Sequence, residues 1–389
     1  MNQCFKKRRT EIGIIAAAVG VRLAVYLLSV CVLVMFGQYT QPLILSDFLR
    51  AWTRWDSPHY IDVARYGYSG AIEDGKHLFL VFYPLFPWLL KLLHVIISDY
   101  RLCGVLLNMI CYAVGSLYFY KLTEREFGEK AAKNATIMLA VFPFSFFFGA
   151  VLTESLFFAI SAAFLYYLRE HKWGLVALLG FLACLTKVQG VLLAPAVAAE
   201  ILYAEHFLAK LKEKDWKAIF KRIILPGLLC AIMLLGLGVY LYINWRVEGD
   251  PFRFLYYQRT HWFNGYLPIW KTISYVAQNA FTIGYTSVGL SIWVPEFVLF
   301  FVWLGWIVCG ICRRLRPMYL LYLTALFLVT FSSSWLISGG RYTLCALPGF
   351  MLTGEWLGRH ERWRVPAVAL SAMLMTLYLA GYLTGKQVM

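Results

Sequence analysis

Long apolar runs separated by short polar segments make up most of the chain. The first run extends from Ile12 to about Gly37, after the basic cluster Lys6-Lys7-Arg8-Arg9. It is longer than a signal-peptide core and lacks a small-residue cleavage site. Because a bilayer crossing takes roughly 20 apolar residues, this run predicts an uncleaved membrane-spanning helix. The whole pattern predicts an all-α, polytopic membrane protein with about 11 spans.

Basic clusters recur between the apolar runs at every second turn, as the positive-inside rule predicts for cytoplasmic segments. The segments expected on the cytoplasmic side are the amino terminus and residues 121–133, 169–172, 210–222, 313–316 and 359–364. The segments expected on the extracytoplasmic side are residues 38–100, 153–155, 187–190, 245–280 and 339–341.

Some apolar runs are too short or too interrupted for a full crossing. Leu78–Ile97 is one, and we interpret it as a re-entrant or interfacial helix. Its expected breaks are Pro84, Pro87 and the Ser98-Asp99 turn. Trp173–Thr186 and Val191–Tyr203 predict a pair of short helices whose tip, residues 187–190, lies below the membrane surface. Backbone at that depth must line a cavity or be buried in protein.

No internal repeat or long linker divides the chain, so we expect one integral membrane domain over residues 1–389. Its expected parts are the first span (12–37), a large extracytoplasmic loop with the re-entrant or interfacial helix (38–100), a short-helix core (101–204), a cytoplasmic basic loop (205–223) and the carboxy-terminal spans (224–389, with an outer loop at 245–280). The first of these loops is the natural place for water-dependent chemistry.

Composition supports the membrane class, since 61% of the residues are hydrophobic and 15% are charged. The 36 Lys and Arg exceed the 21 Asp and Glu, but they lie between apolar runs, so they indicate topology and not nucleic-acid binding. Cys309-Gly-Ile-Cys312 has redox-motif spacing at the end of a span, yet the nine cysteines show no pairing pattern. The histidines are not clustered, and no metal site is predicted.

The polar, aromatic-rich segment 52–68 follows the first span and carries the clearest candidate chemistry. Asp56 has two interpretations. It is either the N-cap of a helix with Pro58 near its first position, a role that Ser57 fills equally well, or a general base that faces a cavity. On helical spacing, His59 shares a face with Asp56. The rings suited to a sugar are Trp52, Trp55 and Tyr60.

Further charged residues lie near the expected outer ends of spans, where an ionisable group is by default a functional candidate. Glu154 either lines a site or belongs to a solvated turn. Lys187 either extends to water or binds an anion. Arg341, which follows two glycines, either binds phosphate through its forked donors or anchors the chain at the interface. Arg259 lies in the aromatic segment 250–262, a pattern that an interfacial aromatic belt also produces.

One acidic, aromatic loop and several separated cations suit a lipid-phosphate donor and a hydroxyl acceptor. Four blocks of the chain also carry a family resemblance: residues 54–60 (Arg-Trp-Asp-Ser-Pro-His-Tyr), 64–68 (Ala-Arg-Tyr-Gly-Tyr), 82–87 (Phe-Tyr-Pro-Leu-Phe-Pro) and 142–157, which hold Phe-Pro and Thr-Glu-Ser-Leu-Phe. They resemble the PIG-V family (GPI mannosyltransferase 2-type) of the GT-C superfamily of multi-span glycosyltransferases. The compact chain is typical of a prokaryotic member.

The resemblance implies a GT-C-type fold, a polyprenyl-phosphate-mannose donor, inverting transfer on the extracytoplasmic side and Asp56 as catalytic base. Where the family tends to have Arg-Ser-Asn-Gly, this chain has Lys187-Val188-Gln189-Gly190. The positive charge and the glycine are kept, and Gln189 becomes a candidate acceptor contact. The GPI acceptor is not carried over, and a lipid or a glycan is expected in its place.

Charge placement suggests roles for the other residues. A leaving lipid phosphate needs preorganised cations, for which Arg341 and Lys187 are the first candidates and Arg259 the third. The residues expected at the sugar or the acceptor are Trp52, Trp55, His59, Tyr60, Glu154 and Gln189. Because the leaving group is a monophosphate ester, the chemistry requires no metal or other cofactor. The first loop has no tight Asp-x-Asp pair, and a metal held by Asp56 with Asp62 or Asp47 is the alternative left open.

Other functions remain open at this point. The same type of enzyme could move another polyprenyl-phosphate sugar, such as glucose or an aminopentose. A transporter or flippase of lipid-linked glycans also uses broken helices and buried ions, but it predicts inverted repeats, which the sequence lacks. A non-catalytic scaffold has no need of Asp56 together with Glu154, Lys187 and Arg341. The lipid bilayer is a partner in every case, and a partner subunit is left open.

Overall fold

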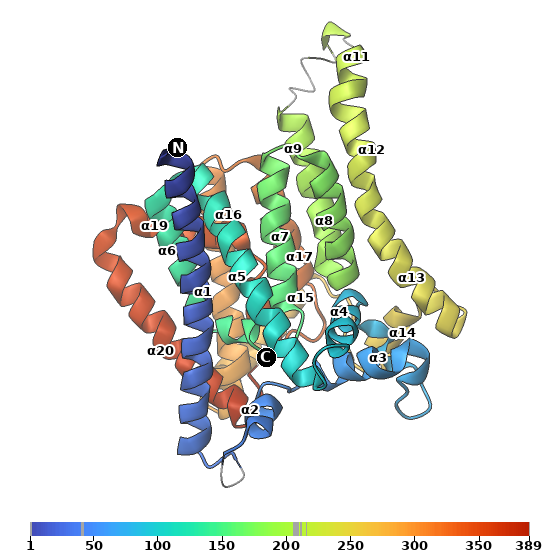
Figure 1. The fold of residues 1–389 in the computed structure, drawn as a ribbon, viewed down its shortest axis with the longest axis vertical. Helices are drawn as coiled ribbons and strands as arrows, with labels where there is room; N and C mark the ends of the chain where they lie inside the picture. The colour runs from blue at the N-terminus through green and yellow to red at the C-terminus, as the bar shows by residue number, and fades with distance from the viewer. Residues whose placement is uncertain (1, 40–42, 205–209, 211, 215, 389) are drawn as a thin grey trace.

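The computed structural model of the protein describes residues 2–39, 43–204, 210, 212–214 and 216–388. Within these residues the protein is a bundle of helices with no strand, only isolated β-bridges (Figure 1). The expected basic loop 205–223 and the start of the large outer loop fall partly outside the described residues. The all-α prediction is confirmed.

Helices of very different length form the amino-terminal half. They are α1 (Asn2–Met35), α2 (Leu45–Ala51), α3 (Ser57–Gly70), α4 (Leu85–His94), α5 (Tyr100–Phe127), α6 (Glu129–Ala140), α7 (Glu154–Arg169), α8 (Trp173–Thr186) and α9 (Ala194–Ala204). Short 3-10 turns lie between them at η1 (Leu78–Val81), η2 (Ser145–Phe148) and η3 (Val188–Leu193).

The carboxy-terminal half continues in the same way. Its helices are α11 (Trp216–Ile219), α12 (Leu225–Ala231), α13 (Leu235–Glu248), α14 (Arg253–Thr260), α15 (Ile269–Thr282), α16 (Val294–Cys312), α17 (Pro317–Thr330), α18 (Gly339–Thr343), α19 (Leu347–Arg359) and α20 (Arg364–Leu383). The expected outer loop 245–280 is therefore not a plain loop, because it contains α14 and most of α15.

Several helices can cross a membrane. By length and composition, the described residues contain five such segments: Arg8–Met35, Tyr100–Phe127, Phe220–Glu248, Gly289–Cys312 and Glu361–Leu383. Shorter apolar helices accompany them: Leu85–His94, Trp173–Thr186, Val188–Ala204 and Pro317–Thr330. This supports a multi-pass membrane protein, while the total of about 11 spans stays a prediction.

The helix breaks explain how the short elements form. Pro84 precedes α4, and the Asp99 carboxylate caps α5 by accepting a hydrogen bond from the Arg101 amide at 2.8 Å. The break expected at Pro87 is wrong, because Pro87 lies in the first turn of α4, where the backbone amides make no intrahelical hydrogen bond that a proline could remove. With 10 residues, α4 is too short to cross a bilayer, as the sequence predicts.

Aromatic packing fixes the centre of the bundle. Helix α7 is buried along most of its length and packs against α5 and α8, while α6 packs against α19. The phenylalanine-rich segment before α7 is also buried, and its Phe146 and Phe147 pack against Tyr382 of α20. The amino end of α7 is thereby placed in the protein interior.

The two predicted sets of polar segments lie at opposite ends of the bundle. Segments expected on the cytoplasmic side are joined by the ion pairs Glu11–Lys121 at 2.9 Å and Glu126–Arg169 at 2.6 Å, and Arg316 of another such segment binds Glu200 of α9 at 2.6 Å. They share one end with the amino terminus, whereas α2 and α3 lie at the other (Figure 1). This arrangement matches the predicted alternation, and the end that faces the cytoplasm stays a prediction.

Glu200 is the most buried residue of these ion pairs, so its replacement should lower the stability of the fold. Its fully buried carboxylate accepts hydrogen bonds from both Nε and Nη2 of Arg316, at 2.6 and 2.7 Å, and contacts His171 at 2.9 Å. We expect Glu200→Gln to destabilise the fold by about 2–3 kcal/mol, because the partly buried Arg316 loses its counter-charge. The measurement is the apparent melting temperature in detergent. Glu361→Gln, which loses only an exposed pair with Lys130, should leave it unchanged.

Candidate functional site

Four charged residues predicted from separate parts of the chain converge in one buried cluster, which we call the charge cluster. Its members are Asp56 before α3, Glu154 at the start of α7, Lys187 between α8 and η3, and Arg341 in α18. Ion pairs of 2.8–3.0 Å connect them. The cluster combines two carboxylates with two cations, so its formal charges balance.

Glu154 is the centre of the charge cluster. Its fully buried Oε1 accepts hydrogen bonds from Lys187 Nζ at 2.8 Å and from Arg341 Nε at 3.1 Å, and Arg341 Nη2 lies 3.0 Å away. The other carboxylate oxygen, Oε2, has no hydrogen-bond partner among the described residues. The solvated-turn interpretation of Glu154 is therefore wrong, and one acceptor atom stays available in a buried polar site.

Asp56 is the accessible member of the charge cluster. Its Oδ2 accepts a hydrogen bond from Arg341 Nη1 at 3.0 Å, and 27% of its side chain is exposed, against 6% for Arg341 and none for Glu154. Asp56 occupies the N-cap position of α3, with a proline in the first turn, but its side chain makes no capping hydrogen bond. The carboxylate is thus held by the cluster and reaches the surface.

The backbone before Asp56 is strained. Trp55 has a φ of 59°, in the left-handed region that large side chains rarely adopt. Such a conformation costs on the order of 1–3 kcal/mol and persists where the surroundings hold it, often at functional sites. The turn therefore fixes the direction in which Asp56 leaves the backbone.

The carboxylates of the charge cluster keep its arginine in the charged form. Burial on its own would lower the pKa of Arg341, but the carboxylates of Glu154 and Asp56 raise that pKa above its ordinary value. Burial, and then the nearby Asp56 and Glu154 carboxylates, raise the pKa of Tyr60. Arg341 therefore stays a cation and Tyr60 a neutral phenol over the usual pH range.

Unpartnered polar atoms lie in the segments that carry the charge cluster. Trp55 Nε1, Glu154 Oε2 and Gln189 Oε1 are buried and have no hydrogen-bond partner among the described residues. Each such atom costs about 1–3 kcal/mol when it stays unpaired. They belong to the Asp56 turn, the charge cluster and the Lys187 turn, so a polyhydroxylated ligand bound there would supply the missing partners.

Two close backbone approaches hold the cationic segments in place. Gly190 packs against the backbone of Ala183 in α8 so tightly that a Cβ would overlap it. Gly339, at the start of α18, lies against Glu296 of α16, whose Oε1 accepts a hydrogen bond from the Gly339 amide at 2.6 Å. The glycines before Arg341 thus allow contact with protein rather than with an open ligand space. Sequence analysis missed Glu296, although an isolated acid in an apolar span is the signal that marks it.

Other predicted site residues lie elsewhere. Trp52 is fully buried, with its indole Nε1 donating to Ser29 at 3.0 Å and its ring 4.9 Å from that of Tyr26, so the expected open ring face is wrong. His59 packs on the rings of Phe79 and Phe82. Tyr60, in contrast, is buried near the Asp56 and Glu154 carboxylates, and its ring packs on Phe82 and Phe86.

Arg259 is the predicted cation that the charge cluster does not include. It lies on α14 with an exposed side chain and makes no ion pair with the described residues. Within the described residues, no group of three or more His, Cys, Asp and Glu side chains is arranged to hold a metal ion.

The fold is that of a known class of membrane proteins. The crystal structure of ArnT from Cupriavidus metallidurans bound to undecaprenyl phosphate matches with a TM-score of 0.56 at 15% identity, over 96% of this chain and 77% of that chain. The apo structure of the same protein matches with a TM-score of 0.54 at 15% identity, over 97% and 78%. The protein therefore has the GT-C-type fold that the sequence predicts.

Sequence comparison gives a more local result. Residues 83–242 match the family described as dolichyl-phosphate-mannose-protein mannosyltransferase, a stretch that holds Glu154 and Lys187 but neither Asp56 nor Arg341. A search of curated proteins finds no match. The chain is thus similar to glycosyltransferases in fold and, over this stretch, in sequence.

Proposed function

We propose that this protein is a membrane glycosyltransferase that moves mannose from a polyprenyl-phosphate-mannose donor to a hydroxyl group of a lipid or glycan acceptor on the extracytoplasmic side. The observation that carries the proposal is an accessible carboxylate, Asp56, held by Arg341 in the buried charge cluster. The match to a mannosyltransferase family and the fold shared with ArnT, a protein that binds undecaprenyl phosphate, support it.

In the proposed reaction, the acceptor hydroxyl oxygen attacks the anomeric carbon while its proton passes to Asp56. The bond between that carbon and the donor phosphate oxygen breaks, and its electron pair leaves with the phosphate. Attack from the side opposite the leaving group inverts the anomeric centre. Arg341 holds Oδ2 of Asp56 through a hydrogen bond of 3.0 Å from Nη1. We therefore assign proton transfer to Oδ1.

The same network prepares the site for the leaving phosphate. Arg341 and Lys187 are the proposed sources of positive charge, and Glu154 holds both in place before the donor arrives, so little reorganisation is needed. Glu154 Oε2 and Gln189 are proposed to accept and orient sugar hydroxyls. The exposed Arg259 is at most an outer contact for the donor, because it lies apart from the charge cluster.

Within this class, we propose a PIG-V-like mannosyltransferase. The support is the block from Arg54 to Tyr60, which precedes the stretch matched to the protein mannosyltransferases and contains the accessible carboxylate. A second candidate is transfer of another polyprenyl-phosphate sugar, since the full-length similarity to ArnT concerns the fold and leaves the sugar open.

A donor panel tests the proposed function. Purified protein in lipid nanodiscs is supplied with membrane extract of the host as acceptor and with polyprenyl-phosphate-linked mannose, glucose or aminopentose, each radiolabelled. We expect a labelled product from the mannose donor, at a rate at least tenfold above the other two. Addition of EDTA to a parallel reaction should not reduce the rate, because the proposed chemistry uses no metal.

The alternatives give different results. Transfer of glucose or the aminopentose in preference to mannose would keep the enzyme class and overturn the donor sugar. Absence of transfer from every donor, together with passage of a labelled lipid-linked sugar across the bilayer, would instead assign the protein to the transporters. Loss of activity in EDTA, restored by a divalent cation, would contradict the metal-free mechanism.

A further inference from the structure

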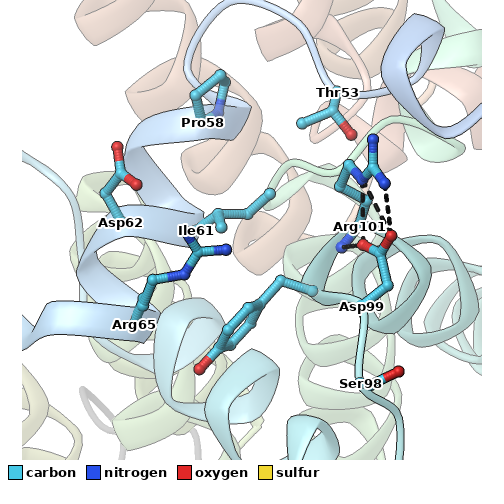
Figure 2. A pocket seen from close by; sticks show the side chains of 9 residues that line it. Thr53, Pro58, Ile61, Asp62, Arg65, Ser98, Asp99 and Arg101 are labelled. Carbon is cyan, nitrogen blue, oxygen red and sulfur yellow. Dashed lines mark hydrogen bonds and ion pairs between the residues drawn. The ribbon is translucent and has the colours of Figure 1, made fainter. Parts of the chain in front are cut away.

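A polar cavity of about 520 Å³ opens between the Asp56 turn, α3 and the start of α5 (Figure 2). The residues that line it are Thr53, Pro58, Ile61, Asp62, Arg65, Ser98, Asp99, Tyr100 and Arg101. No member of the charge cluster is among them. The volume lies within the range of about 300–1,000 Å³ typical of small-molecule sites.

The cavity begins at the turn that carries Asp56. Thr53 and Pro58 both line it, and they flank Asp56 on either side in the chain. Asp56 itself is the one partly exposed carboxylate of the charge cluster. A ligand in the cavity therefore lies next to the turn that presents Asp56.

The charged groups on the two sides of the cavity differ in the hydrogen bonds that they make within the protein. Asp99 and Arg101 bind each other through hydrogen bonds of 2.6–3.2 Å and form a fixed polar wall (Figure 2). Asp62, across the cavity, makes no hydrogen bond or ion pair with the described residues. The Arg65 guanidinium lies over the rings of Tyr66 and Tyr100 and has a single long hydrogen bond, 3.5 Å, to the Tyr66 hydroxyl.

We propose that this cavity binds a neutral sugar unit of the acceptor. Sugar hydroxyls would donate hydrogen bonds to Asp62 and accept them from Arg65, with Pro58 and Ile61 against the apolar face of the ring. Two carboxylates balance two guanidinium groups in the cavity, so it carries no net positive charge to favour a phosphate. The inference rests on the proposed function, because it names the acceptor for the Asp56 site.

Saturation-transfer NMR on the full-length protein in lipid nanodiscs tests the inference without catalysis. The probes are methyl α-mannobioside, a neutral glycoside, and inositol 1-phosphate, an anionic headgroup. We expect the wild type to bind the glycoside and not the phosphate. Asp62→Asn and Arg65→Gln should each weaken glycoside binding at least tenfold, as expected when a hydrogen bond to a charged group is lost. Asp74→Asn, an exposed change in the same outer loop, is the matched control.

Each other outcome has a definite meaning. Equal glycoside binding by the wild type and Asp62→Asn, or no binding by the wild type, overturns the acceptor site. Preferential binding of inositol 1-phosphate overturns the choice of a neutral sugar. Failure of the proposed function is separate, because it appears as absent transfer in the donor panel whether or not the glycoside binds here.

Discussion

Replacement of Asp56 by asparagine should reduce sugar transfer by about 10²- to 10⁴-fold, the usual contribution of a positioned general base. The substitution is nearly isosteric, and the asparagine oxygen can still accept the hydrogen bond from Arg341 Nη1 that Asp56 Oδ2 accepts at 3.0 Å. The charge cluster and the fold should therefore persist. What is lost is the ability to take a proton from the acceptor hydroxyl.

The measurement separates chemistry from binding. Initial rates of radiolabelled mannose transfer give kcat, and the donor concentration at half-maximal rate should change by less than about threefold, because the phosphate contacts are proposed to lie on Arg341 and Lys187. Asp74→Asn, which changes an exposed acid of the same outer loop, should behave as wild type. A rate for Asp56→Asn within tenfold of wild type, with an unchanged melting temperature, would make Asp56 structural and remove the proposed mechanism.

The sequence could predict the members of the charge cluster because burying a charged side chain among apolar residues is unfavourable, so such residues are rare and usually functional. Glu154, Lys187 and Arg341 each stood out as an ionisable group near the end of an apolar run. Their meeting could not be predicted, because Asp56 and Arg341 are 285 positions apart and only tertiary packing brings them together. The pairing adds something that the sequence does not show, since both cations are already bound to carboxylates in the protein.

Aromatic residues show where local pattern fails. A tryptophan in a polar loop can be exposed or buried, and the sequence does not distinguish the two. Trp52 turns inward because Tyr26 of α1 and Tyr382 of α20 pack against its ring. Glu296 was missed for a different reason. The isolated acid in an apolar span is visible in the sequence, but its contact with the Gly339 amide, 43 positions away, exists only in the folded protein.

Helix boundaries were predicted best where one residue dictates the backbone. Pro84 and Asp99 mark real helix starts because a proline and a capping carboxylate act locally. The loop expected at 245–280 is too long, since α15 begins at Ile269. The sequence of α15 is strongly amphipathic, and a search for fully apolar spans overlooks such a helix.

Arg341→Lys should keep the fold and lower transfer about 100-fold, which separates the geometry of Arg341 from its charge. The guanidinium reaches Glu154 Oε1 through Nε and Nη2 while Nη1 donates to Asp56. A lysine keeps the positive charge but cannot span both carboxylates with a planar fork. Asp56 then loses its orienting donor, and removal of one preorganised donor typically costs about 10²- to 10³-fold in kcat.

The fold should survive this change because the charges still balance: Glu154 keeps Lys187 at 2.8 Å and gains a second ammonium group nearby. Arg341→Gln, in contrast, leaves the cluster with one cation fewer than carboxylates and should also lower the melting temperature. The matched control is Arg259→Lys, the same replacement at an exposed arginine of the outer segment, which should retain the wild-type melting temperature and at least half of the wild-type rate.

If Arg341→Lys transfers sugar as fast as wild type, the positive charge alone is sufficient, and the orientation of Asp56 by Arg341 does not contribute to the rate. If Arg341→Lys and Arg341→Gln lose stability and activity equally, the arginine acts through the fold, and the preorganised phosphate site must be sought around Lys187.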